Sequence, residues 1–171
     1  MSAVPRSVTQ AVETLVAKME AGDYNPTPII DLGALIANAD GVVDAEEIDT
    51  LRHILEPMLG AELPTEVVRF LIDASLHVIK ADGLDARLRL VAEIMLDCDA
   101  AEPALLVALG VAFASVGYTD AERGVVEKLA NTMEVPLDRL QQLVETMRKS
   151  YQDIPPVSSK KRSNEPSGMR G

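Results

Sequence analysis

The sequence predicts an all-α fold: a compact bundle of about seven to eight helices with a weak internal two-fold repeat. Apolar residues make up 47% of the chain but aromatic residues only 3%, so the core must consist mainly of aliphatic side chains, which favours packed helices over a sheet. Apolar residues also recur at helical spacing in segment after segment. A turn followed by a helix-capping motif occurs twice, which indicates the repeat.

Helical patterns follow one another along the whole chain. Ser7 is expected to cap the first helix, which ends at Gly22 and the Pro-containing run after it. Pro28 and Pro136 are well placed at helix starts, where the missing backbone N–H costs nothing. The expected helices cover, in chain order, about 7–21, 29–39, 44–60, 64–81, 86–98, 103–118, 119–133 and 136–151.

The stretch 103–119 carries no charged side chain. A helix that is apolar all round lies either at the centre of a core or in a membrane. The stretch contains a proline, two glycines and the hydroxyl side chains of Ser115 and Thr119, and neither flank is basic, so it falls short of a good membrane span. We therefore expect it to be buried in the core.

One domain is expected over residues 1–151, followed by a disordered tail rich in Pro, Ser and Lys over 152–171. The net charge is −11, and the tail holds four basic and two acidic residues, which leaves −13 on the body. Such a surface repels nucleic acid and attracts divalent cations or basic partners. A single cysteine and the lack of a secretory signal pattern predict a cytoplasmic protein.

Two acidic loops contain the residues that suggest chemistry. In the first, the turn at Asp40 leads to Asp44, which can cap a helix, and to Glu47, which can reach back to it. Thr119 and Glu122 repeat that spacing, with Asp120 between them.

Two interpretations of these loops remain open. Helix capping alone explains Asp44, Glu47 and Glu122, but it does not require Asp40 or Asp120. Their concentration at two related loops makes all five candidate ligands for Ca²⁺ or another divalent cation, shared across a pseudo-two-fold axis if the two halves pack face to face. The first loop is not an EF-hand by itself, because Ile36 occupies the first ligand position.

The segments 39–47 (ADGVVDAEE) and 117–122 (GYTDAE) resemble the TerB family of tellurite-resistance proteins, whose fold also occurs in the N-terminal region of the co-chaperone DjlA. The resemblance spans roughly 28–148. It implies a compact bundle of helices, no established enzymatic activity and acidic loops linked with metal-ion binding. Val116 departs from the pattern, because it stands where the second loop would carry an Asp.

These observations predict a non-enzymatic, stress-linked interaction module with a divalent-cation site. No phosphate loop, nucleophile elbow or Cys-x-x-Cys motif is present in the sequence. A protein partner is expected, whereas a nucleic-acid partner and stable membrane insertion are not, and the oligomeric state is open. The alternative is a protein-docking adaptor without metal binding, which would act through a groove between helices. A metal-dependent hydrolase ranks third, because the loops offer almost no Lys, Arg or His to assist catalysis.

Overall fold

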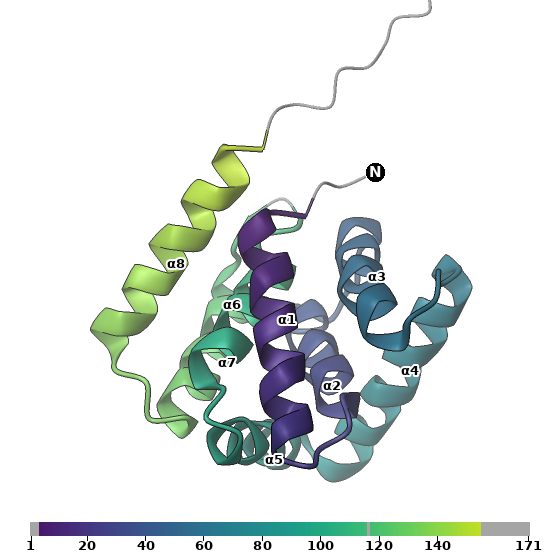
Figure 1. The fold of residues 1–171 in the computed structure, drawn as a ribbon, viewed down its shortest axis with the longest axis horizontal. Helices are drawn as coiled ribbons and strands as arrows, with labels where there is room; N and C mark the ends of the chain where they lie inside the picture. Colours follow the sequence, from purple (N-terminus) through teal and green to yellow (C-terminus); the bar gives the residue numbers. More distant parts are fainter. Residues whose placement is uncertain (1–3, 116, 155–171) are drawn as a thin grey trace, which may run out of the picture.

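The computed structural model describes residues 4–115 and 117–154 (Figure 1). Within these residues the chain forms eight α-helices and no β-strand, which confirms the predicted fold class. The helices are α1 (Arg6–Ala21), α2 (Thr27–Ala37), α3 (Ala45–Leu59), α4 (Thr65–Asp82), α5 (Leu84–Asp97), α6 (Ala101–Ala112), α7 (Asp120–Thr132) and α8 (Leu137–Gln152).

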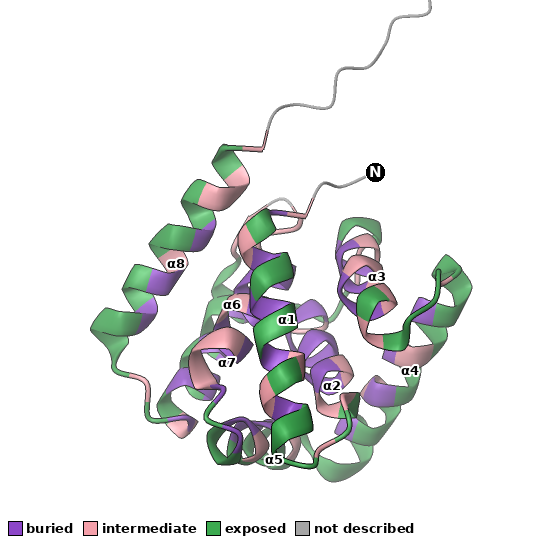
Figure 2. Cartoon of the chain, viewed as in Figure 1, coloured by how far each residue is buried: buried purple, intermediate pink, exposed green. Residues whose placement is uncertain are grey.

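Two apolar helices, α2 and α6, form the centre of the bundle (Figure 2). They pack against each other, α1 covers α6, and α4 and α5 cover α2. The arrangement is close to symmetric, because α2 also contacts α7 while α6 contacts α3. These reciprocal contacts are what the predicted two-fold relation between the α2–α3 and α6–α7 pairs requires.

The uncharged stretch is largely buried over 104–112, as predicted, but α6 ends at Ala112, and the later described residues are half-buried, with Thr119 exposed. Gly110 lies so close to α1 that a Cβ there would come within 2.7 Å of Val8 Cγ2. In the same way, a Cβ on Gly33 would overlap the Leu51 side chain of α3. None of the helices in the described part of the chain combines the length and the apolar character that crossing a bilayer requires.

Besides the end of α6, three predicted helix starts are wrong. Ser7 does not cap the first helix, because Pro5 stands at its N-cap and places Ser7 inside the first turn, where its Oγ is buried without a hydrogen-bond partner. The second helix begins two residues earlier than predicted, at Thr27, because Pro28 sits in its first turn. The fifth helix begins at Leu84, since Gly83 with φ of 91° is enough to end α4 and start α5.

The last helix ends where the tail is expected to begin. Gln152 is the final residue of α8, and the structure describes the chain only as far as Ile154. The rest of the predicted tail lies outside the described residues, as does Val116 in the second acidic loop.

Candidate functional site

The two predicted capping boxes are both complete. The Asp44 carboxylate accepts the Glu47 backbone N–H at 2.9 Å, and the Glu47 carboxylate accepts the Asp44 backbone N–H at 2.9 Å. In the second loop, Thr119 Oγ1 accepts the Glu122 backbone N–H at 3.2 Å, and the Glu122 carboxylate accepts the Thr119 N–H at 2.8 Å. Each box satisfies N–H groups that the first turn of a helix leaves without partners, so the capping interpretation is confirmed.

The two acidic loops approach their caps in a similar way. Gly41 precedes the first cap with φ of 87°, and Gly117 precedes the second with φ of 141°, conformations that side chains disfavour. The glycines are offset by one residue when the two capping boxes are aligned. The two loops therefore share a left-handed glycine ahead of a capping box, but they differ in length by one residue.

The glutamates of the two boxes meet in the interior. Glu47 and Glu122 each expose only 2% of their surface, and their carboxyl groups lie close enough to hydrogen bond to each other. Burial raises the pKa of Glu47 to about 8; the charges of Asp44 and Glu122 add to this, while the bond from the Asp44 N–H opposes it. Near neutral pH the pair therefore holds a proton that an exposed glutamate would have released.

The other three predicted ligands, Asp40, Asp44 and Asp120, do not all lie near the Glu47–Glu122 pair. Asp44 is half-buried beside Glu47, whereas Asp40 is exposed and its Oδ1 accepts the Val42 N–H of its own turn at 3.0 Å. The Asp120 side chain is 99% exposed and points to Arg123 at 3.6 Å. Residues 4–115 and 117–154 contain no group of three or more His, Cys, Asp or Glu side chains placed to hold a metal ion. The pair Glu47 and Glu122, with Asp44 beside it, is thus the part of the predicted set that the fold brings together.

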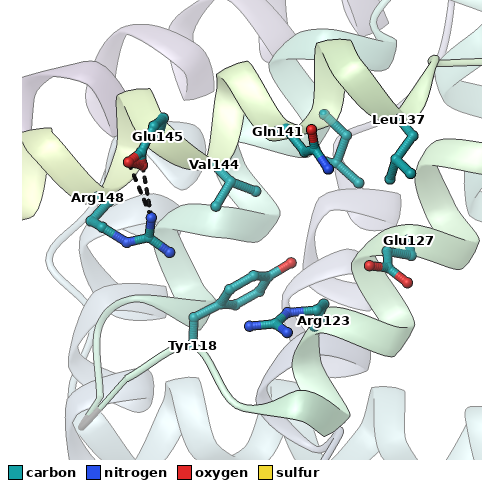
Figure 3. Close-up of a pocket in the computed structure, with 9 residues that line it drawn as sticks. Tyr118, Arg123, Glu127, Leu137, Gln141, Val144, Glu145 and Arg148 are labelled. Atoms are coloured by element: carbon teal, nitrogen blue, oxygen red, sulfur yellow. Dashed lines mark hydrogen bonds and ion pairs between the residues drawn. The ribbon is translucent and has the colours of Figure 1, made fainter.

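A groove of about 420 Å³ lies between α7 and α8 (Figure 3). Its wall on α8 alternates apolar with polar and charged side chains, and its floor is the ring of a tyrosine that comes from the loop before α7. It is lined by Tyr118, Arg123, Glu127, Leu137, Leu140, Gln141, Val144, Glu145 and Arg148.

Two arginines flank the floor of this groove. The Arg123 guanidinium lies over the Tyr118 ring, 5.5 Å from its centroid, and Arg148 lies 5.8 Å from the Phe113 centroid. The two rings stack with their centroids 5.1 Å apart. Arg148 is also paired with Glu145 on its own helix, at 2.7 Å. Such exposed pairs contribute little stability, so an anionic ligand could compete for these guanidinium groups.

A buried ion pair between α2 and α5 was not predicted. Arg87 Nη2 lies 2.6 Å from an Asp31 carboxylate oxygen, and the Asp31 side chain is 6% exposed. The signal was available in the sequence, because Asp31 is the single charged residue of the otherwise apolar α2. The sequence does not identify Arg87 as the partner of Asp31, since Arg87 is one of several arginines on amphipathic segments. The pair holds α5 against the central helix rather than forming a reactive site.

The fold and this site define a class, an all-α bundle with paired capping boxes whose glutamates meet. No protein-family model matches the chain, and neither a curated protein nor a solved structure matches it. The TerB resemblance therefore rests on the loop residues alone.

Proposed function

We propose that the chain is a non-enzymatic, TerB-like helical module that acts as a stress-linked interaction protein and holds a divalent cation between its two halves. The observation that carries the proposal is the meeting of Glu47 and Glu122, which come from equivalent capping boxes far apart in the sequence. The two carboxyl groups are the start of a Ca²⁺ or Mn²⁺ ligand set that water would complete, since no third carboxylate of the described residues is placed to join them.

Burial of the pair supports the non-enzymatic part of the proposal. A hydrolytic metal site keeps a coordination position open to substrate and has a base or donor beside it. Glu47 and Glu122 are almost fully buried, so a substrate would not reach an ion between them. The cation would instead replace the shared proton and tie α3 to α7, which makes the stability of the bundle responsive to cation concentration.

Calorimetric titration and thermal unfolding with Ca²⁺, Mg²⁺, Mn²⁺ and Zn²⁺ test this proposal. We expect saturable heat and a rise in melting temperature that follows mass action for at least one ion. Affinity should increase as pH rises through about 8, because the cation competes with the proton on Glu47. The absence of both signals for all four ions would refute the cation site.

Matched variants identify the ligands. Glu122→Gln keeps the capping hydrogen bond through its amide oxygen but removes the charge, so it should abolish the cation response. Asp120→Asn and Asp40→Asn remove exposed charges that stand apart from the pair, so they should leave the stoichiometry unchanged. Loss of binding in either Asp variant would place the ion at the loop surface instead.

The groove between α7 and α8 favours a second candidate, a protein-docking adaptor. Leu137 stands 59% exposed at one end of the groove, and the lining holds two arginines and two glutamates, so the groove is less acidic than the protein as a whole. The chemistry fits an amphipathic helix with leucines on one face and glutamates beside them. The groove would thus take an acidic peptide, whereas the negative net charge of the body favours basic partners.

Fluorescence anisotropy with such a labelled peptide tests the adaptor function. The acidic peptide should bind, its Lys-substituted counterpart should bind much more weakly, and Arg123→Ala with Arg148→Ala should remove the difference. Equal affinity for the two peptides would exclude the groove as the docking site. Because the peptide test needs no metal, its result is independent of the cation titration.

A further inference from the structure

The outward face of α4 carries apolar side chains that nothing in the described chain covers. α4 lies at the edge of the bundle, and one side of it is exposed along its length (Figures 1 and 2). Phe70 is 70% exposed, and Val67 and Val78 are 40% and 37% exposed. In a chain with only two phenylalanines, leaving one in solvent is costly, and contiguous exposed apolar residues mark interaction sites.

The stripe is self-complementary. Val67, Phe70, Ala74, Val78 and Ala81 are all exposed and follow one another at intervals of three, four, four and three residues, which places them on one face of the helix. That pattern reads the same in both directions. If two copies of α4 pack antiparallel with the two-fold axis at Ala74, Phe70 of one copy faces Val78 of the other, and Val67 faces Ala81. The small Ala74 side chains at the crossing allow the two helices to approach closely.

The charges beside the stripe select the same orientation. Glu66 and Asp73 lie in the first half of α4, while His77 and Lys80 lie in the second half, on the flank next to Phe70. Antiparallel packing brings this flank of one copy against the same flank of the other, so that Glu66 lies beside Lys80 of the second copy and the two Asp73 side chains lie near each other at the axis. Parallel packing would turn these flanks away from each other and form no such ion pair. Within the described residues neither Glu66 nor Lys80 has an ion-pair partner in its own chain.

We propose that the chain forms a homodimer through α4, packed antiparallel against α4 of a second copy about a two-fold axis at Ala74. The interface is isologous, so each contact occurs twice. It is separate from the Glu47–Glu122 pair and from the groove between α7 and α8, so it does not depend on either proposed function.

Sedimentation velocity on the full chain, from low to high micromolar concentration, tests the proposal. The wild-type protein should change from monomer to dimer across this range. Phe70→Glu should raise the dissociation constant at least about a hundredfold, because a symmetric interface loses its largest apolar side chain twice. Val42→Glu is the matched control, since Val42 is 67% exposed but lies outside α4, and it should dimerise like wild type. A monomeric wild type, or a dimer that survives Phe70→Glu, would overturn the proposal.

Cysteine cross-linking tests the orientation. Ala74→Cys should form a disulfide-linked dimer under mild oxidation, because the two side chains meet at the axis. Ala81→Cys should not link to itself, since its two copies would lie about 20 Å apart along the helices, but it should link to Val67→Cys when the two variants are mixed. The wild-type chain, whose one cysteine is the buried Cys98, should remain unlinked. Self-linking at position 81 without linking to position 67 would show a parallel pair and refute this arrangement.

Charge exchange provides a further check that does not alter the apolar stripe. Glu66→Lys should weaken the dimer several-fold, because Lys would then face Lys80 of the second copy. Adding Lys80→Glu restores opposite charges across the axis and should recover the wild-type affinity. If the double variant stays as weak as the single variant, these charges do not face each other and the proposed register is wrong.

Discussion

Replacing Glu47 by Gln should stabilise the protein at neutral and alkaline pH and remove part of its pH dependence. The pKa of Glu47 is raised from 4.5 to about 8 in the folded protein, mainly by burial. Between these values the folded state holds a proton that the unfolded chain has released, so the free energy of unfolding decreases as pH rises from about 4.5 to about 8. A Gln side chain resembles the protonated glutamate: its oxygen can still accept the Asp44 N–H, and its amide can donate to Glu122.

The magnitude follows from the size of the pKa shift. Each pKa unit corresponds to about 1.4 kcal/mol, so wild type should lose about 3 kcal/mol between pH 5 and pH 8 through this group. Glu47→Gln should lose little over that interval, and its advantage over wild type should therefore grow with pH. Below about pH 4.5 the two proteins should be nearly equally stable, because Glu47 is then protonated in both states.

Urea unfolding followed by circular dichroism, at a series of pH values, measures this difference. Contributions from groups that are the same in both proteins cancel in the comparison. Glu46→Gln is the control, since Glu46 is an exposed neighbour on the same helix turn and should leave the pH dependence as it is in wild type. Parallel curves for wild type and Glu47→Gln would show that no proton is retained at this pair.

Further substitutions test the packing and the caps. Arg87→Ala should cost about 3–5 kcal/mol in urea unfolding because it leaves Asp31 buried and unpaired, and adding Asp31→Asn should recover much of that loss. Gly33→Ala should destabilise the protein by about 1–3 kcal/mol, since its Cβ would overlap the neighbouring helix, while Gly124→Ala should stabilise it by about 0.5–1 kcal/mol at an open position, both measured by thermal unfolding. Asp44→Ala should cost about 1 kcal/mol in metal-free buffer through loss of the helix cap.

The local sequence pattern was sufficient to predict the helices and the two capping boxes. The spacing of apolar residues identified every helix of the described chain, because the period of 3.6 residues is imposed by backbone geometry whatever the rest of the protein does. The capping boxes were equally readable, since their hydrogen bonds join residues three positions apart. Boundaries were less certain where two start signals compete: Pro5 rather than Ser7 begins α1, because a fixed φ and a missing N–H suit the position before the first turn.

Tertiary packing decided which acidic residues meet. Asp40, Asp44, Glu47, Asp120 and Glu122 look alike in the sequence, where each is a carboxylate near a turn. Only the crossing of the two helix pairs at the centre of the bundle buries Glu47 against Glu122 and leaves Asp120 in solvent. The same packing determines that Asp31 faces Arg87 and that Phe70 faces outward. Such pairings depend on how distant helices are oriented, and a local period specifies which face of a helix is apolar but not which neighbour that face will contact.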